Sequence, residues 1–197
     1  MSSGYGIKFE KALLFANRVH AGQWRKGTRI PYITHLLAVA AIVGEHGGNE
    51  DEVAAALLHD TIEDTPTTRE DLAVRFGEDV ASIVAGCSDA DTIPKPPWRE
   101  RKESHIERMR HASRSVRLVS AADKLHNARS ILTDLRTCGE VVFRRFHGGR
   151  EGTLWYYRTL ARVFEETDGG PLADELARVV QDIEALSKGS HPTRSTP

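Results

Sequence analysis

The stretch AAALLHDTIEDT, residues 54–65, determines both the fold and the site that we expect for this chain. Its alanines and leucines strongly favour a helix. Its second half places four ionisable side chains within six residues, namely His59, Asp60, Glu63 and Asp64. At about 100° per residue, all four fall within less than half of the circumference of a helix. Pro66 cannot continue the helix, so we expect the cluster in its last turn.

Three carboxylates held this close together repel one another unless positive charge lies among them. A plain surface helix would also prefer Lys or Arg in its last turn, because acids there oppose the helix macrodipole. An arrangement that local stability disfavours suggests a functional origin. The adjacent pair His59 and Asp60 offers a metal ion one nitrogen and one oxygen. The alternative reading is a solvated helix end that carries acids.

Composition excludes several other classes of protein. The 197 residues suffice for one domain with a sizeable core. With 27 basic and 28 acidic residues, the charge does not indicate a nucleic acid or membrane partner, and no stretch approaches the ~20 apolar residues of a membrane span. Cys87 and Cys138 form neither a metal-binding spacing nor a disulfide framework. We expect a cytoplasmic protein without a secretory signal, and a homo-oligomer stays open.

Apolar periodicity and breaker residues predict an all-α fold, a single domain of about eight to ten helices over residues 1–186. Thr34 and Thr67 or Thr68 are the expected N-caps of two of the helices. The predicted helices are residues 9–21, 35–45, 49–62, one that ends at 76, 78–86, 103–111, 115–135, 152–166 and 172–186. Residues 91–101 contain three prolines and predict an exposed loop. Residues 187–197 predict a disordered tail.

Two other predicted helices supply side chains that can join the His59–Asp60 pair. His35 lies in the first turn of one helix. Asp123 lies in the apolar stretch 119–125 of another, where a lone carboxylate is costly unless it is paired or bound to a cation. Two imidazoles and two carboxylates suit Mn²⁺, Fe²⁺ or Zn²⁺ with open coordination positions, and argue against a closed structural zinc site.

The order H…HD…D on helices resembles the HD-domain metal-dependent phosphohydrolases. Three stretches resemble the hydrolase domain of RelA/SpoT-type alarmone enzymes more closely: HAGQWRKG at 20–27 with PYITH at 31–35, ALLHDTIEDT at 56–65 and ADKLHNAR at 122–129. The resemblance spans roughly residues 8–166, and no synthetase domain follows. The chain therefore resembles a stand-alone small alarmone hydrolase.

The resemblance implies a role for each matching residue. The ligands of one divalent metal, Mn²⁺ in most of that family, correspond to His35, His59, Asp60 and Asp123. The acidic pair that handles the nucleophilic water corresponds to Glu63 and Asp64. Substrate-binding positions correspond to Arg25, which stacks on guanine, and to Lys26, Asn127 and Arg129. Relatives that do not hydrolyse alarmones lose the HDxxED residues; this chain keeps all four, so we expect activity.

The implied reaction removes the 3′-pyrophosphate of ppGpp or pppGpp and gives GDP or GTP and pyrophosphate. Two alternatives remain open at this point. One is an HD phosphohydrolase that acts on another nucleotide, either a nucleoside 5′-monophosphate or NADPH at its 2′-phosphate. The other is a regulatory module that binds alarmones without turnover. The intact pair Glu63 and Asp64 argues against the regulatory module.

Overall fold

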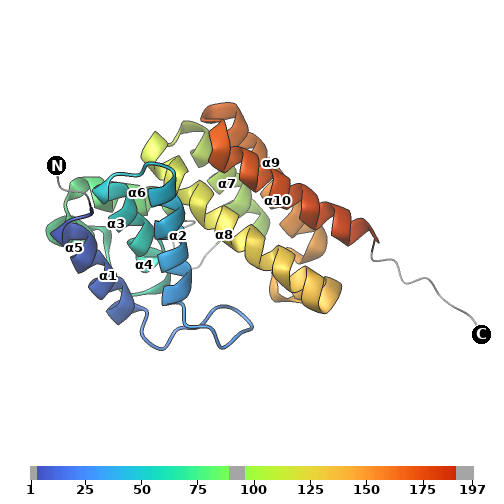
Figure 1. Ribbon diagram of the computed structural model, residues 1–197, viewed down its shortest axis with the longest axis horizontal. Helices are drawn as coiled ribbons and strands as arrows, with labels where there is room; N and C mark the ends of the chain where they lie inside the picture. Colours follow the sequence, from blue (N-terminus) through green and yellow to red (C-terminus); the bar gives the residue numbers. More distant parts are fainter. Residues whose placement is uncertain (1–3, 89–95, 190–197) are drawn as a thin grey trace, which may run out of the picture.

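The computed structural model describes residues 4–88 and 96–189, and within these ranges the chain is helical throughout apart from loops and an isolated bridge between Trp24 and Pro31 (Figure 1). The expectation of an all-α fold is confirmed. The elements are α1 (Ile7–Val19), α2 (Ile33–Glu45), α3 (Glu50–Leu58), α4 (Thr61–Asp64), α5 (Arg69–Phe76), α6 (Glu78–Cys87), α7 (Trp98–His111), α8 (Arg114–Cys138), the 3₁₀ helix η1 (Gly139–Arg145), α9 (Gly149–Thr167) and α10 (Gly170–Gly189).

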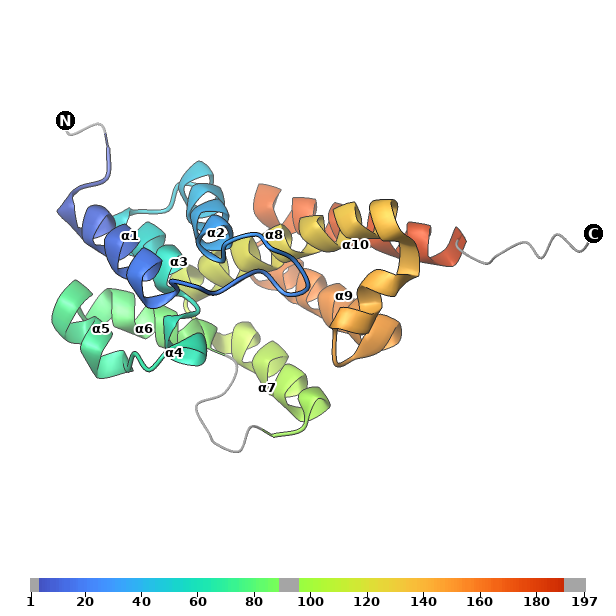
Figure 2. The ribbon, with the colours of Figure 1, turned by 90° about the horizontal axis from the view of Figure 1, so that it is seen from below.

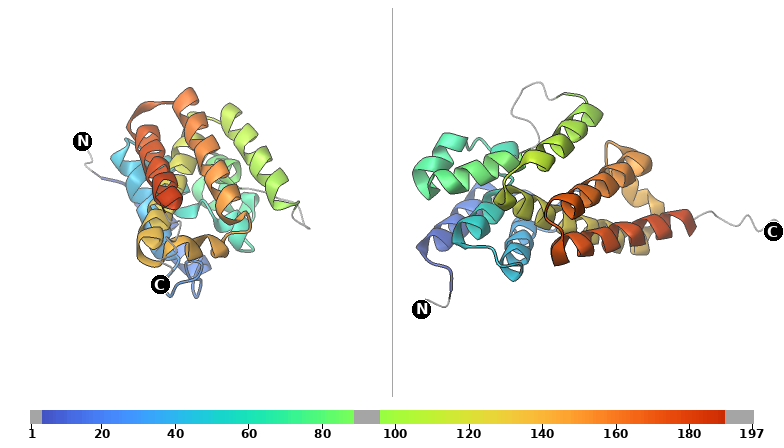
Figure 3. Two further views of the ribbon diagram at one scale, coloured as in Figure 1. Left: turned by 90° about the vertical axis from the view of Figure 1, so that its right-hand side faces the viewer. Right: turned by 90° about the horizontal axis from the view of Figure 1, so that it is seen from above.

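The long helix α8 is the central element of the fold. Its N-terminal part packs against α2, α3 and α6, and its remaining length packs against η1, α9 and α10 (Figures 2 and 3). Ser113 caps its first turn by accepting a hydrogen bond from the backbone N–H of Val116. Gly139 ends it at φ +67°, a conformation that glycine adopts without strain. Residues of α8 therefore face both groups of helices.

Helix α3 is the most deeply buried element, since every residue from Val53 to Leu58 is buried. Asn49 and Glu52 form a capping box at its start. The predicted single helix 49–62 is wrong at its end, because α3 stops at Leu58 and α4 begins at Thr61. The Thr61 hydroxyl donates to the Leu58 carbonyl at 2.6 Å and replaces a helical backbone donor there. The acidic cluster therefore straddles a break between two helices.

Two further expectations about helix ends need correction. Thr34 is not the N-cap of α2, because the helix starts at Ile33 and the Thr34 hydroxyl donates to the Pro31 carbonyl inside the first turn. Residues 98–101, expected in a loop, form the start of α7. The rest of that predicted loop lies mostly outside the described residues. Thr68, by contrast, caps α5 in a capping box with Asp71, as expected.

The C-terminal half of the molecule supplies one wall of the candidate active site that is described below. Helices α9 and α10 lie along α8, and η1 connects α8 to α9 (Figure 3). Trp98 of α7 packs against the backbone of Gly148 and Gly152, where a β-carbon would meet its ring at 2.5 and 3.0 Å. Helix α10 extends beyond the predicted boundary at 186, and Ser187 is buried in it. Residues 190–197 of the predicted tail lie outside the described residues. Among the helices that the structure describes, none combines the length and the apolar character of a membrane span.

Candidate active site

Three helices bring the predicted metal ligands together. His35 comes from α2, His59 from the C-cap of α3, and Asp123 from α8; all three are buried, and one ligand atom of each lies within 4.8 Å of the others. His35 Nε2 lies 3.2 Å from Asp123 Oδ1. The break after α3 directs Asp60 into the same cluster, with its Oδ2 3.0 Å from His59 Nε2 and 3.7 Å from His35 Nε2.

The hydrogen bonding of His59 leaves a lone pair directed into this cluster. Its Nδ1–H donates to the Ala56 carbonyl at 2.8 Å, which leaves Nε2 unprotonated in the neutral ring. Nε2 is buried and has no hydrogen-bond partner among the described residues. It faces a carboxylate oxygen of Asp60 at 3.0 Å, so in the neutral ring two lone pairs oppose each other unless a proton or a metal cation lies between them. A cation between them relieves that opposition, and the donor set therefore fits a divalent metal.

The titration behaviour of the cluster also indicates a demand for positive charge. Burial lowers the pKa of His59, but the charges of Asp60 and Asp123 outweigh burial and leave this pKa well above its ordinary value. Burial likewise acts to raise the pKa of Asp60, but the charge of His59 holds it well below the ordinary value. The carboxylates thus stay ionised and attract a cation at neutral pH.

His126 orients the ring of His35, a role that the sequence did not indicate. The Nδ1 atoms of the two rings lie 2.8 Å apart. Burial, together with the nearby charges of His35 and Arg25, lowers the pKa of His126 to about 4, so this ring is neutral. Its Nδ1 then accepts from His35 Nδ1–H, which leaves His35 Nε2 as a ligand atom. In this arrangement His126 supports His35 and is not itself a ligand.

Hydrogen bonds from neighbouring side chains hold the two carboxylates in place. Tyr32 donates to Asp60 Oδ2 at 2.5 Å, while Asn127 and Lys124 donate to Asp123 at 2.5 and 2.6 Å. Partners of this kind fix the orientation of metal ligands and commonly affect metal affinity as well. Sequence analysis missed Tyr32 in this role, although Tyr32 lies within the PYITH stretch that carries the resemblance.

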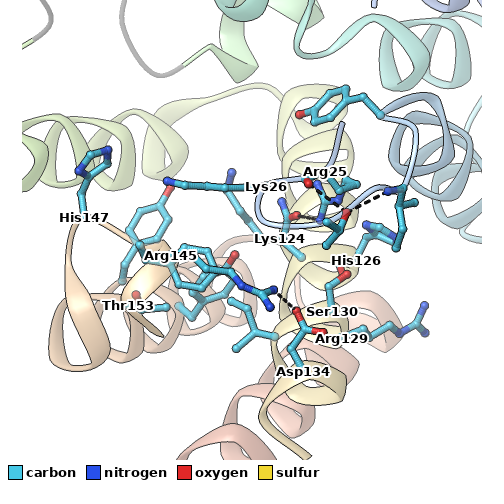
Figure 4. A pocket seen from close by; sticks show the side chains of 18 of the residues that line it. Arg25, Lys26, Lys124, His126, Arg129, Ser130, Asp134, Arg145, His147 and Thr153 are labelled. Carbon is cyan, nitrogen blue, oxygen red and sulfur yellow. Dashed lines mark hydrogen bonds and ion pairs between the residues drawn. The ribbon is translucent and has the colours of Figure 1, made fainter. Parts of the chain in front are cut away.

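A cavity of about 1020 Å³ opens beside this cluster, and Figure 4 shows side chains that line it. Its walls come from the loop 21–32, from α4 and α7, from one face of α8, and from η1 and α9. Seven cationic side chains line it: Arg25, Lys26, Arg101, Lys102, Lys124, Arg129 and Arg145. The volume accommodates a nucleotide-sized ligand, and the concentration of cations suits one that carries several phosphates.

The predicted catalytic acids lie at the metal end of this cavity. Glu63 and Asp64, both on α4, line it, and Glu63 also lines a smaller cavity of about 100 Å³ together with His59, Asp60 and Asp123. Glu63 therefore stands between the ligand cluster and the larger cavity. This position lets a carboxylate act on a water molecule beside the metal.

The four predicted substrate-binding residues all line the cavity, but with different partners. Arg25 Nη2 donates to the Asn127 side-chain carbonyl at 2.7 Å, which ties the loop 21–32 to α8 (Figure 4). Asn127 thus contacts both Arg25 and the metal-end residue Asp123. Arg129 forms an ion pair with Glu175 of α10 at the edge of the cavity. Two further residues that line the cavity were not predicted from the sequence. Arg145 lies in a segment without a periodic pattern, and Asp134 lies on α8 beyond the stretch 122–129.

Comparison with known proteins shows the family to which this chain belongs. A family model described as an HD domain matches residues 12–154, so the chain belongs to the HD-domain family. Among curated relatives, the chain is 44% identical over 141 residues to the guanosine-3′,5′-bis(diphosphate) 3′-pyrophosphohydrolase MESH1 of Xenopus tropicalis, covering 70% of this chain and 74% of that protein. It is 42% identical over 127 residues to the human MESH1, covering 63% of this chain and 67% of that protein.

Longer relatives and solved structures agree with this assignment. The bifunctional (p)ppGpp synthase/hydrolase SpoT of Escherichia coli is 39% identical over 130 residues, which cover 63% of this chain and 18% of SpoT. The structure of a metazoan orthologue of SpoT that hydrolyses ppGpp matches with a TM-score of 0.76 at 27% identity, over 91% of this chain and 97% of that one. A Listeria monocytogenes structure matches with a TM-score of 0.69 at 34% identity, over 78% and 99% of the two chains.

Proposed function

We propose that the protein hydrolyses the 3′-pyrophosphate of guanosine alarmones with the help of a divalent metal ion. The reaction consumes one water and converts ppGpp or pppGpp into GDP or GTP and pyrophosphate. The observation that carries the proposal is the cluster of His35, His59, Asp60 and Asp123 at one end of a cation-lined cavity. The curated relatives named as 3′-pyrophosphohydrolases support the same substrate.

The ligand set supports a single divalent ion, and we propose Mn²⁺. Two imidazole nitrogens and two carboxylate oxygens suit borderline metals of the first transition row better than Mg²⁺ or Ca²⁺, which prefer oxygen alone. The chemistry that such an ion supplies when bound is a water of lowered pKa and a polarised phosphoryl oxygen. The residues assigned to hold it are those whose lone pairs converge in the cluster.

The remaining steps belong to side chains of the chain itself. Glu63, with Asp64 beside it on α4, accepts the proton of the attacking water and keeps that water oriented. The water oxygen forms a bond to the phosphorus next to the 3′ oxygen, and the bond between this phosphorus and the 3′ oxygen breaks. The 3′ oxygen takes a proton from solvent and leaves as a hydroxyl group, Glu63 returns its proton to solvent, and pyrophosphate is released.

Cationic side chains neutralise the phosphates during this step. Lys102 and Lys124 line both cavities and are therefore placed near the scissile group. Arg25 and Lys26, from the loop 21–32, line the larger cavity and supply charge to the rest of the nucleotide. Arginine adds a planar fork of donors that matches phosphate oxygens, and its face can stack on a base.

The test is pyrophosphate release from ppGpp by the purified protein in Mn²⁺, beside Asp60→Ala and a panel of NADPH and deoxynucleoside 5′-monophosphates. We expect release from ppGpp that disappears in Asp60→Ala. Phosphate from a panel nucleotide and none from ppGpp would keep the HD chemistry and overturn the substrate. Tight binding of ppGpp without turnover of any compound would instead indicate a regulatory module.

We propose a cytoplasmic location on the basis of the free cysteines Cys87 and Cys138, which suit a reducing compartment. A homo-oligomer stays a prediction, and size-exclusion chromatography with light scattering tests it.

A further inference from the structure

A polar stripe runs along one face of α8 from the metal end of the cavity to its far end. Its members are Asp123, Asn127, Ser130 and Asp134, spaced by four, three and four residues. At about 100° per residue these four positions lie within roughly 60° of one another on the helix. Asp134 lies about 16 Å from Asp123 along the axis, at 1.5 Å per residue. It is therefore remote from the predicted metal ligands and lies toward the opposite end of the cavity.

Asp134 is held there by Arg145, which comes from η1. Arg145 Nη1 donates to Asp134 Oδ2 at 2.5 Å, and both side chains line the cavity (Figure 4). The other carboxylate oxygen, Oδ1, accepts no hydrogen bond from a described residue. The side chain of Asp134 is 37% exposed and that of Arg145 is 30% exposed, so a ligand in the cavity can reach both. The pair thus presents an acceptor next to a cationic donor.

A carboxylate at this place opposes the charge of a polyphosphate. The cavity is otherwise rich in cations, and the other acids that line it, Glu63 and Asp64, lie at the metal end. Asp134 would repel a phosphate group, so the part of a ligand that approaches it must offer hydrogen-bond donors. In a nucleotide with phosphates on both the 3′ and 5′ oxygens, most such donors belong to the base.

The surroundings of the pair also suit a base. Ile131 lies one turn before Asp134 on α8, and Phe146 directly follows Arg145; both line the cavity. An aliphatic and an aromatic side chain provide the apolar contact that the faces of a purine favour. A ring between such walls would direct its polar edge at the carboxylate and the guanidinium.

We propose that Asp134 and Arg145 read the edge of the nucleobase and select guanine over adenine; this rests on the proposed function at the same site. Guanine presents the O6 acceptor beside the N1–H and N2–H₂ donors, which match a guanidinium donor beside a carboxylate acceptor. Adenine presents the N6–H₂ donor and the N1 acceptor in the reverse order. The N6–H₂ donor of adenine would then face the guanidinium donor of Arg145, and its N1 acceptor would face the carboxylate acceptor of Asp134.

The test compares kcat/KM for guanosine and adenosine 3′,5′-bis(diphosphate) in the wild type and in Asp134→Asn. A matched control is Asp182→Asn, because Asp182 also pairs with an arginine of α8, Arg136, but outside the cavity. We expect the wild type to prefer guanosine by about 10- to 100-fold, the range of one bidentate base contact. We expect Asp134→Asn to reduce this preference about tenfold or more, since an amide can also pair with adenine.

Three results separate this inference from the proposed function. A guanosine preference that changes no more in Asp134→Asn than in Asp182→Asn would overturn the base-reading role, even if kcat/KM falls for both compounds. Absence of pyrophosphate release from the guanosine compound in the wild type would overturn the proposed function. In that event calorimetric titration with GDP and ADP still decides the inference, which requires tighter binding of GDP and loss of that difference in Asp134→Asn.

Discussion

The two ends of the cavity are built from different kinds of structure. At the metal end, side chains from the packed helices α2, α3 and α8 converge, and His35 and His59 are only 1% and 3% exposed. At the distal end, the loop 21–32 and η1 supply half-exposed side chains such as Arg145. We therefore expect the metal-binding side chains to be held on a rigid support, and the side chains that choose the substrate to lie on segments that tolerate sequence change.

The largest effect is expected at the metal end. Asp60→Ala removes one predicted ligand, whose carboxylate oxygen lies 3.0 Å from His59 Nε2. We expect kcat/KM for ppGpp to fall at least about 1000-fold, beyond the 10- to 100-fold that changes around metal ligands typically cost. Asp79→Ala, which removes an exposed acid of α6, is the control and should leave the rate unchanged. Steady-state pyrophosphate release measures both, and equal rates would refute the ligand assignment.

The second largest effect is expected for Glu63, also at the metal end of the cavity, and it separates catalysis from metal binding. Glu63→Gln keeps the shape of the side chain but removes its ability to accept a proton. We expect kcat to fall roughly 100-fold, while the rise of the melting temperature on adding Mn²⁺ stays that of the wild type, because Glu63 is not assigned as a ligand. Glu70→Gln on the exposed face of α5 is the control. A lost melting-temperature response would make Glu63 a ligand instead.

A smaller effect is expected one hydrogen bond away from the metal. Tyr32→Phe removes the hydroxyl that donates to Asp60 and keeps the ring. We expect the Kd for Mn²⁺, measured by calorimetric titration, to rise about 10-fold. Tyr5→Phe removes a hydroxyl that donates to the Gly48 carbonyl, remote from the site, and should leave this Kd unchanged. The account of Tyr32 fails if the two variants bind Mn²⁺ alike.

The smallest effect is expected at the distal end. Gly27 and Gly22 both have positive φ, +74° and +80°, so an alanine costs about 1 kcal/mol of stability at either position. A β-carbon on Gly27 would lie 2.9 Å from Arg145 Nε, whereas one on Gly22 meets nothing within 4 Å. We expect Gly27→Ala, and not Gly22→Ala, to raise KM for ppGpp several-fold at nearly constant kcat. Similar KM values in the two variants would remove Arg145 from the substrate site.

The same contrast explains what could be predicted from the sequence. The clustering of the predicted ligands was predictable because they lie on helices or directly next to them, where residue spacing determines direction, and because a buried lone carboxylate such as Asp123 requires a partner. The break between Leu58 and Thr61 was not predictable from periodicity, since it depends on one side-chain hydrogen bond. That break nevertheless leaves His59 and Asp60 together.

The part of the distal end that η1 forms escaped prediction for a physical reason. Residues 139–145 form a 3₁₀ helix, whose direction is set by tertiary contacts rather than by an apolar repeat. Arg145 therefore looked like any surface arginine, and Asp134 like a solvated acid of a long helix. Their proximity depends on how η1 folds back on α8, which the sequence pattern does not encode.

The ligand assignment is tested most directly by the anomalous scattering of Mn²⁺ in crystals of the protein. The account predicts one strong peak bonded to His35 Nε2, His59 Nε2 and carboxylate oxygens of Asp60 and Asp123, at the closed end of the cavity and away from Asp134. A peak bonded to other residues, or no peak in crystals whose protein hydrolyses ppGpp in Mn²⁺, would contradict it.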